Sequence, residues 1–184
     1  MLVVGHSVVM FCAGGSQAEA SRRGHYALVS DSLARPRSQG ISHLGLTVSD
    51  LDRSLAFYRD VLGAVVLRAP GDGDNPSFSG RMALVMIGSL GVDLFEHAAS
   101  SGGRFNPAQT GLDHFALIAS SVDDLEAWAR WLDKHGVVCS PIRDSSGVGA
   151  QFDFADPDGI QIEFSFLDQE KLRASGMLSV SDGA

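Results

Sequence analysis

Cysteines and basic residues are scarce in this sequence. Its 2 cysteines, Cys12 and Cys139, form no CxxC pair and no regular spacing, which excludes a disulfide framework and a cysteine metal site and favours a reducing, cytoplasmic compartment. Only 14 Lys and Arg residues stand against 22 Asp and Glu residues, giving a net charge of -8. Because this charge repels phosphate backbones and anionic membrane surfaces, we expect no nucleic-acid partner.

Long hydrophobic runs are also missing. No stretch reaches the roughly 18 uninterrupted apolar residues of a membrane-spanning helix, so we expect no membrane partner. The apolar start of the chain has no positive charges and is interrupted by His6, which is not typical of a cleaved signal peptide. Residues 18–40 are polar and lack periodicity. We therefore expect residues 1–40 to be a poorly ordered extension outside the fold.

The remainder of the chain contains an internal repeat. Residues 41–97 and 111–167 each begin with a strand that carries a histidine, His43 or His114, followed by a helix, a glycine, a short strand and a hairpin of two strands. Each copy alone is a helix on a small sheet, which is too little to enclose a cavity. We therefore predict an α+β fold in which two paired βαβββ modules form a half-barrel, with the functional site between them and residues 168–184 as a C-terminal tail.

The two predicted helices carry signals at their ends. They span about 50–62 and 122–135, and the residues that mark their ends are Ser49, Ser121, Gly63 and Gly136. Serine before the first turn is a favourable N-cap, and glycine past the last turn readily adopts the left-handed conformation. Further along the chain, the sequence DPDG at 156–159 predicts a tight hairpin turn.

Strand alternation selects which polar residues share a face. Successive side chains of a strand point to opposite sides, so each strand that carries a histidine or an acid has an apolar face for the helices and a mixed face. In the strand around 92–97 we expect Asp93 on the mixed face and Glu96 facing out at the strand end. The opposite choice would place Asp93 in the apolar core, at a cost of several kcal/mol for an unpaired charge. In the last strand Glu163 lies on the mixed face.

The spacing of these residues follows the repeat. His43 precedes Asp93 by 50 positions, and His114 precedes Glu163 by 49. Each module therefore supplies one histidine and one carboxylate, and pairing of the modules is expected to bring all four to one concave site. Two imidazoles and two carboxylates suit a divalent ion such as Zn, Ni, Fe, Mn or Co, and are too rich in nitrogen for Mg or Ca. We predict a divalent metal ion as the cofactor.

Three segments carry a family resemblance: HLGLTVSDLDRSLAFYRDVLG, LDHFALIASSVDDLEAW and FADPDGIQIEF. Together they cover roughly residues 41–167, and the sequence resembles the vicinal oxygen chelate superfamily, which includes glyoxalase I, extradiol dioxygenases, methylmalonyl-CoA epimerase, and the fosfomycin and bleomycin resistance proteins. The resemblance implies paired βαβββ modules in one domain and a metal held by His43, Asp93, His114 and Glu163. It also implies a homodimer, in some members with the site built across subunits.

The second metal position departs from glyoxalase I, which normally has Glu where this chain has the shorter Asp93. Two arrangements follow. Asp93 binds the metal directly after a small shift of its strand, or it binds through a water molecule. The second arrangement leaves a facial triad of His43, His114 and Glu163, which resembles that of extradiol dioxygenases.

Other positions bear on the substrate. The chain has Thr47 and His97 where bacterial glyoxalases that use glutathione have Arg and Asn, so the resemblance does not favour a glutathione hemithioacetal. Arg81, Arg143 and His97 are candidates to meet an anionic substrate. The Gly- and Pro-rich loop 69–80 lies beside the expected mouth of the site and is a candidate lid.

The chemistry that the resemblance implies is chelation of a substrate oxygen by the metal, which stabilises an oxyanion or enolate. We expect a glyoxalase-like lyase or isomerase of a small carbonyl compound, with Glu163 as the catalytic residue that shuttles a proton between adjacent carbons. One alternative is an extradiol-type Fe(II) dioxygenase acting on a catecholic substrate. The other is a non-catalytic, ligand-sequestering protein like the bleomycin binders, which hold no metal. The presence of both histidines and both carboxylates argues against this last alternative.

Overall fold

The computed structural model describes residue 38 and residues 40–70, 79–100 and 102–177. The chain divides into two compact units, Met1–Gly40 and Ile41–Ala184, and the fold is that of the second unit. The extension expected over 1–40 lies almost wholly outside the described residues, as does most of the candidate lid at 69–80. Within the described ranges, no helix is long and apolar enough to cross a membrane.

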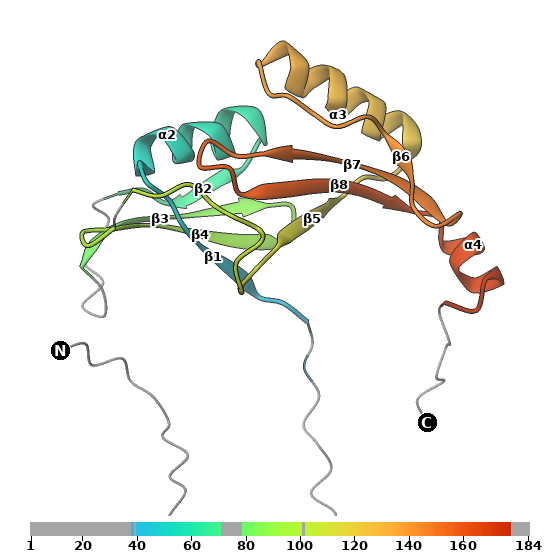
Figure 1. Cartoon of the computed structure of the whole chain (residues 1–184), viewed down its shortest axis with the longest axis horizontal. Coiled ribbons are helices and arrows are strands. Elements are labelled where there is room, and N and C mark those ends of the chain that lie inside the picture. The colour runs from blue at the N-terminus through green and yellow to red at the C-terminus, as the bar shows by residue number, and fades with distance from the viewer. Residues whose placement is uncertain (1–37, 39, 71–78, 101, 178–184) are drawn as a thin grey trace, which may run out of the picture. The chain divides into compact units, whose positions relative to one another are not determined.

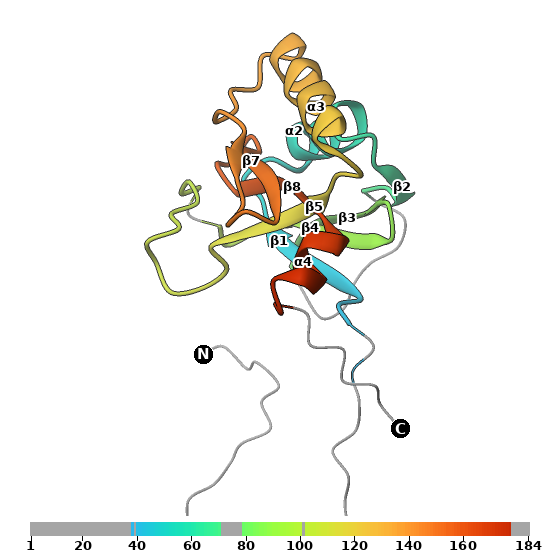
Figure 2. The ribbon, with the colours of Figure 1, turned by 90° about the vertical axis from the view of Figure 1, so that its right-hand side faces the viewer.

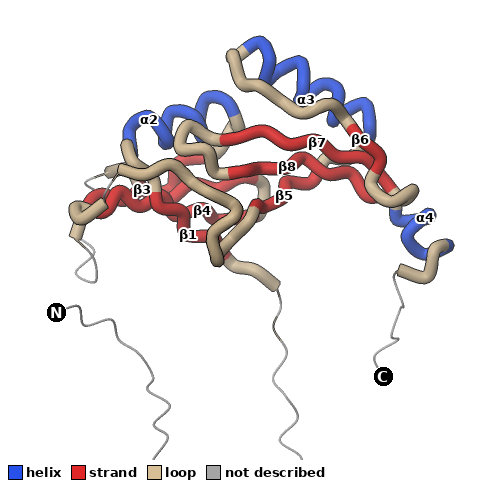
Figure 3. Tube along the Cα trace, in the orientation of Figure 1, coloured by secondary structure: helices blue, strands red, loops and turns tan. Residues whose placement is uncertain are grey.

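Two modules of the same plan make up the second unit (Figure 1 and Figure 3). In the first, the elements are β1 (His43–Thr47), α2 (Leu51–Ala56), the π-helix η1 (Phe57–Val61), β2 (Val65–Arg68), β3 (Gly80–Ile87) and β4 (Leu90–His97). In the second, they are β5 (His114–Ile118), α3 (Val122–Lys134), β6 (Arg143–Asp144), β7 (Gly149–Ala155) and β8 (Gln161–Leu167). A short helix, α4 (Gln169–Ala174), follows in the segment expected as a tail. The predicted α+β fold of two βαβββ modules is confirmed.

Each module forms a four-stranded mixed sheet. The strand orders are β1-β4-β3-β2 and β5-β8-β7-β6. β1 runs parallel to β4 and β5 runs parallel to β8, whereas the other neighbours are antiparallel. Helices α2 and α3 lie on the same side of the sheets (Figure 1), and the apolar strand faces pack beneath them into one core. The opposite faces of the strands are left for polar side chains.

Helix α3 forms as its sequence predicts. The Ser121 side chain accepts a hydrogen bond from the backbone N–H of Asp124 at 3.1 Å and so caps the helix. Gly136, just past the helix end, has a φ of +73°. Leu125 and Leu132 are fully buried. The apolar stripe of the helix therefore faces the core, as its spacing indicates.

The first helix differs from the prediction. Its N-cap is Asp50, whose side chain accepts a hydrogen bond from the N–H of Arg53 at 3.0 Å. From Phe57 on, the helix widens into a π-helix, and the Leu62 N–H donates to the Phe57 carbonyl, five residues back, at 3.2 Å. The prediction of Ser49 as the N-cap is wrong, because the Ser49 hydroxyl donates to a carboxylate of the second module.

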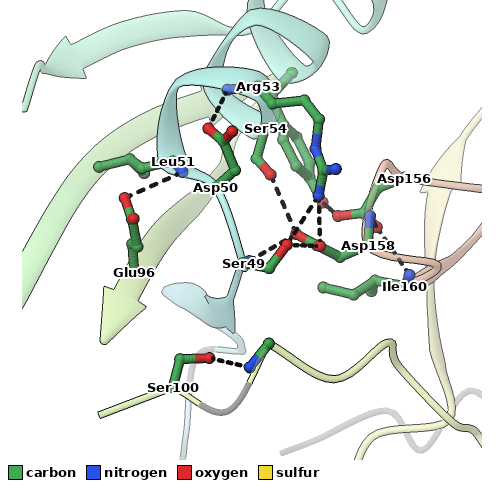
Figure 4. Close-up of polar contacts among 12 residues, drawn as sticks. Ser49, Asp50, Leu51, Arg53, Ser54, Glu96, Ser100, Asp156, Asp158 and Ile160 are labelled. Atoms are coloured by element: carbon green, nitrogen blue, oxygen red, sulfur yellow. Dashed lines mark hydrogen bonds and ion pairs between the residues drawn. The ribbon is translucent and has the colours of Figure 1, made fainter. Parts of the chain in front are cut away.

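That carboxylate belongs to the DPDG turn between β7 and β8 (Figure 4). Asp158, which is 5% exposed, accepts hydrogen bonds from the Ser49 N–H at 3.0 Å, the Ser49 hydroxyl at 2.5 Å and the Arg53 guanidinium at 2.7 Å. Asp156 accepts one from the Tyr58 hydroxyl at 3.3 Å. Burial by itself would raise the pKa of Asp158, but its donors hold that pKa below its ordinary value. The predicted turn is confirmed, and it also fixes the first helix to the second module.

Candidate metal centre

His43 and Asp93 lie side by side on the face of the first sheet that is opposite the helices. In the parallel pair of β1 and β4, Gly45 is opposite Asp93 and His43 is opposite Gly91. The His43 Nε2 and the Asp93 Oδ2 are 3.9 Å apart. A Cβ added at Gly91 would lie 3.1 Å from the Cβ of His43. Glycine at this position therefore leaves room for the imidazole.

Glu96 lies on the other face of β4. Its carboxylate accepts hydrogen bonds from the Leu51 N–H at 3.3 Å, where α2 begins, and from the Arg81 guanidinium at 3.2 Å. Asp93 therefore shares the face of the candidate site, as strand alternation predicts. Arg81 also pairs with Asp52 at 2.7 Å, so its charge is already compensated. The expectation that Arg81 meets an anionic substrate is not supported.

His114 and Glu163 lie on the adjacent strands β5 and β8, which are parallel, with Ala116 opposite Glu163. The Glu163 side chain is buried, although its carboxylate belongs to the mixed face. Burial and, next, the charge of Asp153 raise the pKa of Glu163, and the opposing effect of His114 is smaller. The second module thus holds a carboxyl group that takes up a proton more readily than one in water.

In both modules the residue before the histidine engages its Nδ1 atom. The Nδ1 of His43 is 3.1 Å from the Ser42 hydroxyl, and the Nδ1 of His114 is 2.7 Å from the Asp113 carboxylate. Neither Nε2 has a hydrogen bond among the residues that the structure describes. Metal-binding imidazoles commonly have this arrangement, in which a partner on one nitrogen orients the other toward the ion. The Ser-His and Asp-His pairs are the sequence signal that could have predicted it.

The remaining candidates for an anionic substrate are Arg143 and His97. The Arg143 guanidinium pairs with Asp153, at 2.5 and 3.1 Å, and with Glu163 at 3.4 Å. Like Arg81, it is not a free positive charge, and the expectation for it is not supported. The ring of His97 stacks on that of Phe95, with the ring centres 6.0 Å apart.

The four predicted metal ligands come together as two pairs. Among the described residues, no group of three or more His, Cys, Asp or Glu side chains is placed to hold one metal ion. Each module instead presents one histidine and one carboxylate. Two open imidazole nitrogens and two carboxylates are donors that suit a divalent transition metal. Each of these two pairs, His43 with Asp93 and His114 with Glu163, is called a half-site below.

The sequence did not predict a pocket of about 410 Å³ between the end of β1, the DPDG turn and the segment that links β4 to β5. That segment loops away from the sheets (Figure 2) and has no periodicity to reveal its course. Gly45 and Thr47 line the pocket, as does Arg104. The Arg104 guanidinium lies over Gly159, 3.3 Å from where a Cβ would stand. Gly45 is opposite Asp93 in the sheet, but none of the four predicted metal ligands lines the pocket.

Comparison with known proteins identifies a family that matches this chain. The family model described as Glyoxalase/Bleomycin resistance protein/Dioxygenase superfamily matches residues 40–164. The lactoylglutathione lyase of Haemophilus influenzae is 34% identical over 131 residues, which cover 67% of this chain and 90% of the lyase.

Two solved structures are similar. A glyoxylase/bleomycin resistance protein/dioxygenase domain from Frankia sp. EAN1pec is 30% identical, with a TM-score of 0.63, and the match covers 71% of this chain and 99% of that one. A variant of the fosfomycin resistance protein FosX from Listeria monocytogenes, solved with Mn(II) and 1S,2S-dihydroxypropylphosphonic acid, is 22% identical with a TM-score of 0.57, over 73% of this chain and 97% of that one. At this identity the FosX match supports the fold.

Proposed function

Because the chain belongs to the glyoxalase/bleomycin resistance protein/dioxygenase superfamily, we propose that it is a divalent-metal-dependent enzyme, a glyoxalase-like lyase or isomerase of a small carbonyl compound. The observation that carries this proposal is the matched pair in each module. In each pair a histidine keeps Nε2 open while Nδ1 is engaged, and a carboxylate lies on the neighbouring strand. A lactoylglutathione lyase among the relatives supports lyase chemistry.

The proposed metal-binding residues are His43, Asp93, His114 and Glu163, and the proposed ion is Zn, Ni, Fe, Mn or Co. A bound ion would act as a Lewis acid on a substrate oxygen. In the proposed reaction, the Glu163 carboxylate takes a proton from one carbon and returns it to the neighbouring carbon. Asp93 binds either directly or through a water molecule.

The proposal includes a homodimer that completes the site. Two half-sites in one chain, with no larger cluster among the described residues, suit an arrangement in which His43 and Asp93 of one copy face His114 and Glu163 of a second copy. Ile118 supports it, because this residue shares the mixed face of β5 and is 92% exposed. A second copy packed on this face would remove the exposed Ile118 side chain from water.

The domain spans 41–167, with modules 41–97 and 111–167. Thr47 and His97 argue against a glutathione hemithioacetal as the substrate. A cytoplasmic location is proposed because the 2 cysteines have no disulfide pattern.

Metal analysis of the untagged protein tests the function. We expect a stoichiometric divalent ion in the purified wild type, and its loss in His114→Ala with an unchanged circular dichroism spectrum. The matched control is His135→Ala, because His135 lies at the end of α3 and its Nδ1 contacts the Trp131 carbonyl at 2.8 Å. That variant should keep the metal.

Retention of metal by His114→Ala would contradict the site.

A second experiment measures the activity of the wild-type protein after its metal is stripped and each candidate metal is restored in turn. Iron together with oxygen consumption on a catechol would assign the extradiol dioxygenase reaction, and a wild type that takes up no metal would assign the ligand-sequestering role.

A further inference from the structure

Glu163 is held by two side chains of its own sheet. In the antiparallel pair of β7 and β8, Asp153 is opposite Glu163, and Gln151 is opposite the next residue on the same face, Ser165. The Gln151 amide donates a short hydrogen bond to Oε2 of Glu163. The Arg143 guanidinium, from β6, donates to the same oxygen at 3.4 Å. One oxygen of the buried carboxylate therefore receives two donors.

Arg143 is itself fixed by other contacts. Its two terminal nitrogens donate to the two oxygens of Asp153, at 2.5 and 3.1 Å, and one of them donates to the Ser140 hydroxyl at 3.3 Å. The Ser140 hydroxyl is also anchored, since it accepts a hydrogen bond from the Asp153 N–H at 2.9 Å. A guanidinium oriented in this way by a paired carboxylate keeps its remaining donor at a set position. Arg143 is thus a rigid support for Oε2 and not a mobile charge.

The other oxygen of Glu163 has a different environment. No hydrogen bond to Oε1 is made by any residue that the structure describes. Over the same residues, no buried side-chain nitrogen or oxygen lacks a hydrogen-bond partner. Since Oε1 has no partner and is not among such buried atoms, it must reach the solvent. The carboxylate is therefore divided into one oxygen held by the protein and one open oxygen.

We propose that Gln151 and Arg143 are positioning residues that hold Oε2 of Glu163 and leave Oε1 as the only oxygen available to a metal ion or a substrate proton. This inference rests on the proposed function. Its physical basis is that a carboxylate with both oxygens free can rotate about its terminal bond and bind an ion through either oxygen or through both. Two donors on one oxygen remove that freedom. Side chains that orient a metal ligand in this way are typically worth 10- to 100-fold in metal affinity or activity.

Titration with Co(II) tests the inference without relying on activity, because the visible absorption of bound Co(II) depends on its ligands. We expect Gln151→Met, which has a similar volume and no amide donor, to weaken Co(II) binding by about 10- to 100-fold and to change the absorption spectrum. Arg143→Lys should have a smaller effect of the same kind, because the ammonium keeps the charge. The matched control is Gln169→Ala, since Gln169 is exposed at the start of α4.

The outcomes separate this inference from the function on which it rests. If the wild type binds Co(II) and Glu163→Gln does not, but Gln151→Met binds it with unchanged affinity and spectrum, the positioning role is wrong and the proposed site stands. If the wild type binds no Co(II), both are overturned. Near-ultraviolet circular dichroism of each variant checks that the fold is kept, and Gln151→Ala serves as a second variant if the methionine packs badly.

Discussion

The position of His43 depends on the residue opposite it in the neighbouring strand. Gly91 leaves the space that the imidazole occupies, with only 3.1 Å between the Cβ of His43 and a Cβ that would be added at position 91. The same added atom would lie 3.5 Å from the Ser42 carbonyl. Side-chain size at position 91 therefore sets where His43 can lie relative to Asp93.

We predict that Gly91→Val displaces His43. The branched side chain cannot fit without moving the imidazole, so we expect a loss of about 1–3 kcal/mol in the free energy of unfolding together with weaker metal binding. Urea unfolding and metal titration measure the two effects. Gly103→Val is the control, because a Cβ at Gly103 meets nothing within 4 Å. Unchanged metal affinity in Gly91→Val would show that His43 does not depend on this glycine.

At this scale the sequence predicted the residue types and their faces, but not their partners. Strand alternation was sufficient to choose Asp93 over Glu96, because that choice depends only on neighbours along one strand. The carboxylate partners of Arg143 are 10 and 20 positions away, on β7 and β8. A sequence shows that a positive charge is present, whereas the strand pairing decides whether that charge is free.

The helices of the two modules differ in how far their own sequence determines where they begin. Helix α3 has its cap and its terminal glycine within its own segment, and both were predicted. The start of α2 depends on Asp158, which is 109 positions from Ser49. No local pattern reports such a contact, so the assignment of Ser49 as the N-cap failed. The same contact makes the DPDG turn a structural link between the modules.

We predict that Asp158→Asn destabilises the protein by about 1–3 kcal/mol at neutral pH, because Arg53 loses its ion pair and the Ser49 donors lose a charged acceptor. The folded pKa of Asp158 lies below its ordinary value. Its ionised form therefore contributes fully above the unfolded pKa of about 3.9, and this contribution is lost as the pH falls through the folded pKa.

Urea unfolding at a series of pH values checks this. The difference in unfolding free energy between wild type and Asp158→Asn should be constant from pH 6 to pH 8 and should shrink below about pH 4. The control is Asp133→Asn, an exposed carboxylate of α3, which should stay within about 0.5 kcal/mol of the wild type. A difference that persists unchanged into strong acid would show that the charge of Asp158 is not what stabilises the contact.

For the whole molecule, the internal repeat determines that each chain has two half-sites. The way in which the modules face each other determines which half-sites can share one metal ion. Both modules are present in one chain, yet among the described residues no three of the predicted ligands are placed to hold one ion. The sequence showed that two modules pair, but it could not show whether modules of one chain or of two chains face each other. That choice depends on the exposed surfaces of the folded sheets, of which Ile118 is the clearest example.

We predict that the proposed dimer builds its site from both copies. A heterodimer of His43→Ala with His114→Ala then contains one site that lacks both histidines and one intact site. Each variant by itself should bind no metal, whereas the heterodimer should bind one metal ion. Co-expression with two different tags isolates this species, and elemental analysis after tag removal counts the metal. If each site lay within one chain, both sites would lack a histidine and no metal would be recovered.

A substitution on the exposed face of β5 tests the dimer separately from the metal ligands. Ile118→Asp places a charge where the second copy is expected, so analytical ultracentrifugation should show a monomer with an unchanged circular dichroism spectrum. Metal binding should be lost with the dimer although His43, Asp93, His114 and Glu163 are all present. A wild type that is monomeric at micromolar concentration and still binds metal would contradict the two-copy site.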